Sequence, residues 1–336
     1  MQRARPRYHF TPRKGWMNDP NGLIRFQGKT HVFFQHNPHA AVWGPMHWGH
    51  AVSEDLLYWD ELPLALTPDQ WYEDNGGCWS GSAAEKDGML WLFYTSVSHN
   101  LGQTVSVAVS ADGIHFEKYE RNPVIRAFPA EGSGDFRDPK VTKIGDTWHM
   151  VLGSGKDGVG KILRYTSTDL LHWNDAGVLY QNGAHGAVLE CPDFFPLNDG
   201  YVLLFSRMGR ASHSAVFVMG DFDGQTFTPK EEYMPEAGPH FYAPQTFLDD
   251  RGRRILIAWL YSWSIRPDPG AAYNGALTVP REVRCQDDGR LTLYPVEEAR
   301  HLLRESEPGT ELLCDAGIVE GFVDGGAASF AYWEEL

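Results

Sequence analysis

An internal repeat runs through most of the chain: an Asp is followed, four residues later, by a large apolar side chain. The five copies are Asp55 with Trp59, Asp112 with Phe116, Asp169 with Trp173, Asp223 with Phe227 and Asp287 with Leu291. Successive Asp residues are 57, 57, 54 and 64 positions apart, and a Ser stands two positions before the Asp in the first three copies. Because Asp and Ser side chains bond to nearby backbone in turns, each copy predicts a hairpin turn that leads into a strand.

Five apolar, strand-like runs rich in Val, Ile, Phe and Trp lie between these turns. They are residues 31–35, 90–95, 148–153, 201–206 and 255–260. Helix signals are scarce, and the best one covers residues 296–304. Five units of several short strands predict an all-β fold: a five-bladed β-propeller over residues 1–298 and a short C-terminal extension over residues 299–336. The alternative is a β-sandwich whose segments are alike by chance, and the regular spacing disfavours it.

Three acidic residues fall at one position when the five apolar runs are aligned on one another. The residues 13 or 14 positions before the equivalent points of the runs are Asp19, Ser80, Asp138, Glu190 and Ala243. In a propeller the first strand of each blade faces the central channel, so these acids are expected to share one cavity. Burial and like charge would separate their pKa values, and glycoside hydrolysis requires one ionised and one protonated carboxyl group. Turn capping is the alternative for a single Asp-Pro pair, but it does not explain three acids in register.

The composition excludes several classes of partner. The net charge of −15, from 44 acidic and 29 basic residues, disfavours nucleic acid, anionic membranes and highly phosphorylated ligands. No run approaches the roughly 18 apolar residues of a membrane span. The first twelve residues contain no apolar segment, so we expect a cytoplasmic protein without a signal peptide. Aromatic residues make up 13% of the chain, and their flat faces suit sugar rings.

We expect neither a metal nor a cofactor. The four cysteines form no Cys-x-x-Cys pair, so free thiols are predicted and a zinc site has no support. Residues 153–158 fit the pattern Gly-x-Gly-x-x-Gly, but the residues after them favour a strand and then a turn. A dinucleotide site needs a helix at that point.

Several segments resemble the motifs of glycoside hydrolase family 32, which contains invertases, inulinases and levanases. Residues 16–22, Trp-Met-Asn-Asp-Pro-Asn-Gly, are similar to the nucleophile signature of the family. Further matches follow in the family's order: residues 34–38, 43–53, 80–82, 136–139 (Phe-Arg-Asp-Pro), 190–193 (Glu-Cys-Pro-Asp), 242–245 (Tyr-Ala-Pro-Gln) and 280–282 (Pro-Arg-Glu). The resemblance implies a five-bladed propeller, in agreement with the number of repeats.

The resemblance also implies roles for the matched residues. Asp19 would be the nucleophile and Glu190 the general acid/base. Asp138 would hold the fructose hydroxyls and stabilise the transition state, and the neighbouring Arg137 is expected to keep it ionised. The fructose subsite would be lined by aromatic and polar side chains: Trp16, Asn18, Gln35, Trp43, Ser80, Arg137 and Trp259. Trp79 stands where the family usually has Phe, so it is expected to reshape this subsite or the adjacent aglycone side.

The implied activity is retaining hydrolysis of terminal β-D-fructofuranosyl bonds in sucrose or short fructans, through a covalent fructosyl-enzyme intermediate. A fructan-specific hydrolase or a fructosyltransferase would use the same intermediate. A sucrose-6-phosphate hydrolase would need basic residues at the glucose 6-position; no basic cluster is evident in the sequence, although separate loops of a folded chain are able to assemble one. A sugar-binding propeller without catalysis is disfavoured, because all three acids are present.

The end of the chain departs from the family pattern. Members usually carry a β-sandwich after the propeller, and the 38 residues that follow Glu298 are too few to form one. These residues nevertheless include several apolar anchors: Leu312, Leu313, Ile318, Val319, Phe322, Phe330, Tyr332 and Trp333. We therefore expect the extension to dock on the propeller or on a second subunit. Docking on a second subunit would make the protein a homo-oligomer.

Overall fold

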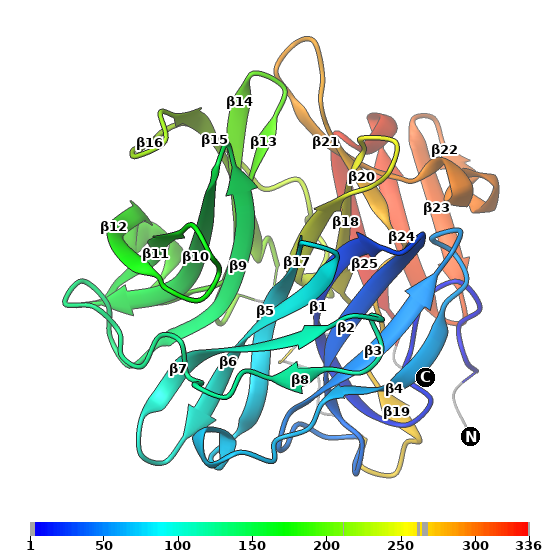
Figure 1. Cartoon of the computed structure of the whole chain (residues 1–336). Helices are drawn as coiled ribbons and strands as arrows, with labels where there is room; N and C mark the ends of the chain where they lie inside the picture. The colour runs from blue at the N-terminus through cyan, green and yellow to red at the C-terminus, as the bar shows by residue number, and fades with distance from the viewer. Residues whose placement is uncertain (1–3, 211, 261–262, 264–267, 335–336) are drawn as a thin grey trace.

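The computed structural model describes residues 4–210, 212–260, 263 and 268–334, and their regular structure is almost entirely β-strand (Figure 1). The first sheet holds β1 (Gly15–Phe26), β2 (Lys29–Asn37), β3 (His47–Ser53) and β4 (Asp60–Leu66), with β19 (Tyr273–Asn274) beside β1. The second holds β5 (Gly77–Lys86), β6 (Met89–Ser98), β7 (Gly102–Ser110) and β8 (Glu117–Lys118). The third holds β9 (Phe136–Ile144), β10 (Thr147–Lys156), β11 (Val159–Ser167) and β12 (Asn174–Gln181).

Three more sheets complete the described chain. The fourth holds β13 (Leu189–Leu197), β14 (Gly200–Arg207), β15 (Ala215–Phe222) and β16 (Phe227–Tyr233). The fifth holds β17 (Tyr242–Leu248), β18 (Arg254–Trp259), β20 (Arg281–Cys285) and β21 (Leu291–Pro295). The sixth holds β22 (Arg304–Glu307), β23 (Thr310–Asp315), β24 (Ile318–Val323) and β25 (Ala328–Trp333). Short 3-10 helices are η1 (Trp71–Glu73), η2 (Gly183–His185), η3 (Glu297–Leu302) and η4 (Asp324–Gly326), so the predicted helical segment near residue 300 is a short 3-10 helix.

The first strands of the first five sheets form a closed ring. Strand β1 contacts β5, β5 contacts β9, β9 contacts β13, β13 contacts β17, and β17 contacts β1 again. Strand β19 lies in the segment that connects β18 and β20 of the fifth sheet, and it pairs in parallel with β1 of the first sheet. In Figure 1 these first strands lie toward the middle of the molecule, whereas the fourth strands β12 and β16 lie toward its edge. The all-β prediction is confirmed, and the five apolar runs fall in the second strand of each of these sheets.

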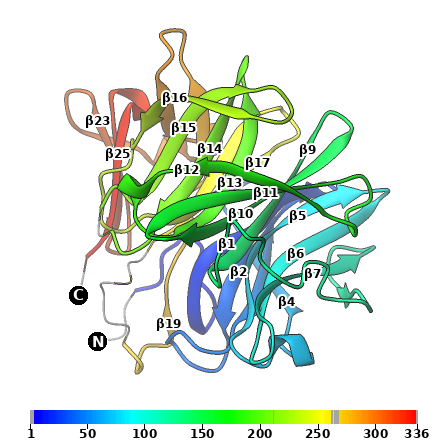
Figure 2. The same cartoon turned by 90° about the vertical axis from the view of Figure 1, so that its left-hand side faces the viewer.

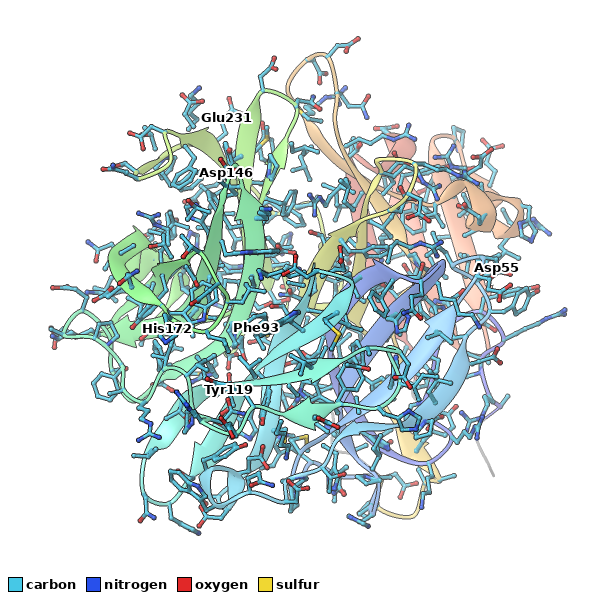
Figure 3. The ribbon with its side chains drawn as sticks, viewed as in Figure 1. Asp55, Phe93, Tyr119, Asp146, His172 and Glu231 are labelled. Carbon is cyan, nitrogen blue, oxygen red and sulfur yellow. The ribbon has the colours of Figure 1, made fainter. Side chains whose placement is uncertain are left out.

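The Asp repeat forms the turns between the third and fourth strands. Oδ1 of Asp55 accepts hydrogen bonds from the backbone N–H groups of Leu57 and Tyr58, both at 2.9 Å, and Asp112, Asp169 and Asp223 make equivalent bonds. In the fifth copy Asp288, one residue later than predicted, accepts the turn N–H from Arg290 at 3.1 Å. Asp55 and the turn residue His172 lie on opposite sides of the molecule in Figure 3.

Each of the five first strands carries a β-bulge opposite its second strand. The register shifts lie between Met17 and Pro20, Trp79 and Gly81, Arg137 and Lys140, Glu190 and Asp193, and Tyr242 and Gln245. A bulge bends the strand and turns a side chain away from its regular direction. The repeated bulges therefore lie at the positions where the sequence predicted converging side chains.

The register corrects one detail of the predicted alignment. Asn21 pairs with Phe33, Lys140 with Val151 and Asp193 with Leu204, so Asp19, Asp138 and Cys191 occupy equivalent positions. Glu190 stands one residue earlier in its strand. A count of 13 or 14 residues could not separate the two alignments, because the lengths of the hairpins differ by one residue.

The C-terminal residues form a complete four-stranded antiparallel sheet that packs against the ring (Figure 2). Its apolar residues alternate, as in a sheet with one covered face. Leu313, Ile318, Phe322 and Trp333 are buried, whereas Leu312, Phe330 and Tyr332 are partly exposed. The predicted docking therefore takes place within the same chain. Within the described residues, no helix has the length and apolar character needed to cross a membrane.

Candidate active site

Asp19 lies at the bulge of β1 and is only 9% exposed. Its Oδ2 accepts a hydrogen bond of 2.6 Å from the hydroxyl of Ser80 on β5 and lies 3.5 Å from Sγ of Cys191 on β13. Among the described residues, its Oδ1 has no hydrogen-bond partner. One oxygen of Asp19 is therefore held by two neighbouring strands, while the other is buried and has no hydrogen-bond partner among the described residues.

Asp138 lies at the equivalent bulge of β9, with a positive φ of 60°. Its Oδ2 accepts a hydrogen bond of 2.8 Å from the backbone N–H of Cys191 and lies 3.5 Å from Sγ of the same residue. The backbone N–H of Asp138 donates to Oγ1 of Thr95 at 2.8 Å. Cys191 thus lies between the carboxylates of Asp19 and Asp138, in contact with both.

Glu190 reaches the same cluster from the preceding position of β13. Its Oε1 accepts hydrogen bonds from Nε and Nη2 of Arg137, at 3.1 and 3.0 Å. Its Oε2 accepts a hydrogen bond from the hydroxyl of Tyr242. Its side chain is 17% exposed, so this carboxylate is the one of the three with the most access to solvent.

Burial dominates the electrostatics of the two aspartates. It raises the pKa of Asp19, and the charge of Glu190 adds to this effect, while Ser80 and Asn18 lower the pKa in part. Burial raises the pKa of Asp138 to about 7; the charge of Arg137 opposes this rise, and the charges of Glu190 and Asp19 add to it. Arg137 lowers the pKa of Asp138, in the predicted direction, but by less than burial raises it; its guanidinium group hydrogen-bonds Glu190 and Asp135.

The predicted aromatic residues form the wall of this cluster. Nε1 of Trp16 donates to Oδ1 of Asn18 at 2.7 Å, and the Trp16 ring meets that of Trp259 edge-on at 5.8 Å. The ring of Tyr242 meets Trp259 in turn, at 6.3 Å. Trp16 and Trp259 are almost fully buried, so they give the site a rigid apolar side.

Three predicted residues lie one step further from the carboxylates. Gln35 on β2 donates through Nε2 to the backbone carbonyl of Cys78 at 2.9 Å. Trp79 packs against the same apolar cluster as Trp16 and Trp259, and its ring meets that of Trp43 edge-on at 6.0 Å. Trp43 is 45% exposed, which suits the rim of a site better than its floor.

Two residues of the cluster, Tyr242 and Cys191, are not among the predicted site residues. Tyr242 belongs to the Tyr-Ala-Pro-Gln motif, and Cys191 follows Glu190 directly. The five-fold alignment contains the signal for both residues. Cys191 occupies the bulge position of Asp19 and Asp138, and Tyr242 occupies the position of Glu190 in the next sheet.

The arrangement provides the two parts of a displacement at a sugar carbon. A buried carboxylate with one unpartnered oxygen is suited to attack, and a second carboxyl group with access to solvent is suited to exchange protons with a leaving group and with water. The described residues contain no group of three His, Cys, Asp or Glu side chains with the geometry of a metal site.

Comparisons with known proteins identify the family of the chain. Residues 9–295 match the family model described as the N-terminal domain of glycosyl hydrolases family 32. The chain is 38% identical to a sucrose-6-phosphate hydrolase of Escherichia coli over 90% of this chain and 66% of that protein, and 40% identical to a raffinose invertase of Escherichia coli over 90% and 67%. It thus spans about two thirds of the length of these relatives. It also resembles the solved structure of a β-fructofuranosidase of Bombyx mori, with a TM-score of 0.89 and 30% identity over 98% of this chain and 88% of that one. The chain therefore belongs to glycosyl hydrolase family 32.

Proposed function

We propose that the chain hydrolyses terminal β-D-fructofuranosyl bonds with net retention, and that sucrose and short fructans are its substrates. The proposal rests on the different burial and hydrogen bonding of Asp19 and Glu190. Asp19 is buried and has one oxygen without a partner, whereas Glu190 is more exposed and is oriented by Arg137 and Tyr242. The names of the relatives support the substrate class, since they include a sucrose-6-phosphate hydrolase, a raffinose invertase and a levanase of Bacillus subtilis. The solved neighbours include a Bombyx mori β-fructofuranosidase variant in complex with sucrose.

The proposed reaction has two steps. Oδ1 of Asp19 attacks the anomeric carbon of the fructosyl unit, while protonated Glu190 gives its proton to the departing oxygen. A water molecule then enters from the side of Glu190, which removes the proton of this water as the fructosyl–Asp19 ester is broken. Asp138 binds the fructose hydroxyls. Trp16 and Trp259 form an apolar wall for the sugar, and Asn18, Gln35 and Ser80 offer hydrogen bonds around it.

Two variants and one product measurement test this function. Asp19→Ala should remove nearly all activity while the protein stays folded. Glu190→Ala should lose activity on sucrose but still release the leaving group, in a burst, from a fructoside with a good leaving group, since the acid matters least in that first step. The first fructose anomer released, followed by NMR, should be the β form. Release of the α form, or near wild-type turnover of sucrose by folded Asp19→Ala, would refute the proposal.

A second candidate activity is hydrolysis of sucrose 6-phosphate, and one observation favours it. The loop between β14 and β15 places three basic residues, Arg207, Arg210 and His213, around a cavity of about 560 Å³. Met208 in this loop lies 3.8 Å from Nη2 of Arg137, so the cavity adjoins the cluster around Glu190. The sequence alone showed no basic cluster, because neighbouring residues of a loop face one cavity only after folding.

Arg210→Gln decides between the two substrates. If sucrose 6-phosphate is the substrate, its kcat/KM should fall at least about tenfold, while that for sucrose stays nearly constant. If sucrose or a fructan is the substrate, the wild-type protein should prefer the neutral sugar and Arg210→Gln should not change that preference. A larger panel with kestose, inulin and levan separates sucrose from fructan preference.

We infer further that the first five sheets are the blades of one propeller that ends near Glu298, and that residues 299–336 are a separate extension. The ring of contacts from β1 to β17 and back supports this inference. We also propose a cytoplasmic location, supported by the four cysteines, which are all free thiols.

A further inference from the structure

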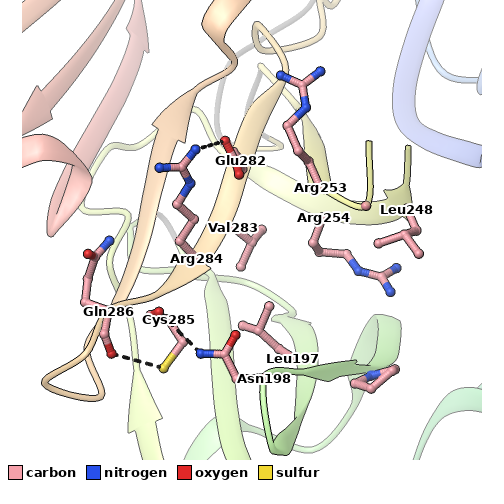
Figure 4. A pocket seen from close by; sticks show the side chains of 12 residues that line it. Leu197, Asn198, Leu248, Arg253, Arg254, Glu282, Val283, Arg284, Cys285 and Gln286 are labelled. Atoms are coloured by element: carbon pink, nitrogen blue, oxygen red, sulfur yellow. Dashed lines mark hydrogen bonds and ion pairs between the residues drawn. The ribbon is translucent and has the colours of Figure 1, made fainter. Parts of the chain in front are cut away.

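A second polar cavity lies far from the carboxylate cluster, between the fourth and fifth sheets. It has a volume of about 320 Å³ and is lined by the ends of β13 and β17 and by the start of β18 and the middle of β20 (Figure 4). Strand β13 runs from Glu190 near one end to Leu197 at this cavity, and β17 runs from Tyr242 to Leu248. At roughly 3.3 Å per residue, the cavity is about 20 Å from Glu190. It is therefore separate from the proposed fructoside site.

Among the described residues, Arg254 brings to this cavity a positive charge that has no ion-pair partner within 4 Å. Its Nε is buried and has no hydrogen-bond partner, and within the described residues the guanidinium group forms no ion pair of 4 Å or less. Burial lowers the pKa of Arg254, and the nearby Asp193 opposes this shift only in part. Asp193 itself is 3.0 Å from Nζ of Lys140, so its charge is already shared.

The other charged residues of the cavity have partners. Arg253 pairs with Asp249 at 2.8 Å and with Glu298 at 2.9 Å. Arg284 pairs with Glu282, as the dashed line in Figure 4 shows, whereas Arg254 extends beside Leu248 without a partner among the residues drawn. Among the described residues, the cavity thus has one positive charge without an ion-pair partner, in a protein whose net charge is −15.

The shape and lining of the cavity indicate what would compensate that charge. The guanidinium carbon of Arg254 lies over the ring of Phe195, 4.6 Å from its centroid, so an aromatic face supports the group. The planar guanidinium group is suited to two parallel hydrogen bonds to an oxyanion. The walls formed by Leu197, Leu248 and Val283 are apolar, and the volume is at the lower end of the range for small-molecule sites.

We propose that this cavity is a binding site for a small molecule with a phosphate group, of the size of a sugar phosphate. The phosphate oxygens accept hydrogen bonds from the guanidinium group of Arg254, and the carbon skeleton of the ligand lies against Leu197, Leu248 and Val283. Since an unpaired, partly buried charge is less stable than a paired one, the ligand also stabilises the contact between the fourth and fifth sheets. The site is independent of the proposed hydrolysis, because none of its residues belongs to the carboxylate cluster.

Isothermal titration calorimetry of the full chain tests this site, with inorganic phosphate and fructose 6-phosphate as two probes and uncharged fructose as a third. The ionic strength is held constant with chloride. We expect saturable binding of a phosphate probe at one site outside the active-site region, and tighter binding of fructose 6-phosphate if the apolar walls hold a sugar. Arg254→Gln should weaken this binding about tenfold or more. Its activity on sucrose should stay at the wild-type level.

Three further variants make the result unambiguous. Arg251→Gln is the matched control, because Arg251 is an exposed neighbour that pairs with Glu297 and does not line the cavity; it should bind as the wild type does. Arg210→Gln removes a basic residue that lines the cavity of the β14–β15 loop. If Arg210→Gln abolishes phosphate binding and Arg254→Gln does not, the phosphate binds near the active site and the proposal is wrong. Arg254→Lys keeps the charge but loses the planar fork, so it should also bind several-fold more weakly. Unchanged binding by folded Arg254→Lys and Arg254→Gln, or no binding by the wild type, overturns the proposal.

Discussion

Asp138 shows how burial and charge compete at a single residue. Arg137 precedes it in sequence, but the Arg137 side chain turns to Glu190 and Asp135, and the pKa of Asp138 rises to about 7. Because the pKa of Asp138 is higher in the folded protein, this group contributes fully to stability only below its pKa in the unfolded chain, near 3.8. That contribution is lost as the pH rises toward and past 7, because the folded protein must then hold a buried charge.

Asp138→Asn should therefore stabilise the protein while it removes activity. The amide has the size of the carboxyl group, is neutral at every pH and still offers an oxygen to the backbone N–H of Cys191. We expect the gain in the free energy of unfolding to be greater at pH 8 than at pH 5 by about 2 kcal/mol. Urea unfolding at both pH values measures it. An equal effect at the two pH values would show that Asp138 is ionised throughout this range in the folded protein.

Ser80 should control the acid limb of the activity profile. Its hydroxyl donates to Oδ2 of Asp19 and favours the ionised form, which is the form that attacks. Ser80→Ala removes this bond, so the pKa of Asp19 should rise further and the acid limb of kcat/KM should move to higher pH, by about one pH unit. Ser82→Ala is the control, because Oγ of Ser82 accepts a hydrogen bond from the backbone N–H of Val141 and not from a group at Asp19. If both variants leave the limb in place, Ser80 does not set the ionisation of Asp19.

At the scale of the elements, the sequence predicted the strands and turns well and the side-chain directions less well. Periodic Asp turns and apolar runs depend on local chemistry, so residues such as Asp55 and Phe93 could be placed from the sequence. The bulges depend on pairing between strands, and the exact position of Glu190 in its strand could not be read from spacing alone. The same limit applies to Arg137, whose partner is set by a neighbouring strand.

The sequence did not predict in detail how the C-terminal sheet contacts the ring. Arg281, from the Pro-Arg-Glu motif, is fully buried and pairs with Glu320 on β24 at 2.6 Å and with Glu236 at 2.7 Å. His9 lies between two carboxylates: Nδ1 is 3.0 Å from Asp315 and Nε2 is 2.9 Å from Glu320. Since both nitrogens face acceptors, the ring binds best as an imidazolium ion.

This contact should make stability depend on pH through His9. Burial alone would lower the pKa of His9, but its bonds to Asp315 and Glu320 raise it above 6.5. The stabilisation is therefore complete below the unfolded pKa of 6.5 and is lost as the pH rises through the higher folded pKa. In His9→Gln, the free energy of unfolding should change less between pH 6 and pH 9 than in the wild type. His99→Gln, at an exposed position, should follow the wild type; identical slopes in all three proteins would contradict this role for His9.

At the scale of the whole molecule, the C-terminal sheet covers one side of the ring and shields it from solvent. Leu313 and Phe322 pack with Val279 and Leu303, and Ile318, Ala331 and Trp333 belong to the same apolar cluster as Trp16 and Trp259. This sheet is therefore joined by packing to the wall of the candidate active site.

Deletion of residues 305–336 should lower the melting temperature markedly or cause aggregation. It exposes an apolar surface that monomers rarely present, and it leaves Arg281 buried without Glu320, a loss of about 3–5 kcal/mol. Thermal unfolding and light scattering measure stability and oligomeric state together. Cys314→Ser, an exposed change in the same sheet, should have no effect. A deletion variant as stable, as soluble and in the same oligomeric state as the full chain would show that the extension has no structural role.

The central claim is that Asp19 forms a covalent bond to the fructosyl unit, and mass spectrometry of the trapped enzyme tests it most directly. Glu190→Ala should accumulate the ester with a fructoside that has a good leaving group, because the second step lacks its base. After acid quenching and trypsin digestion, the peptide of residues 15–25 should carry the mass of one fructosyl residue on Asp19. The double variant Asp19→Ala, Glu190→Ala should carry none. Turnover of the fructoside with an adduct on another residue, or with none when the second step is slow, would contradict the assignment of Asp19.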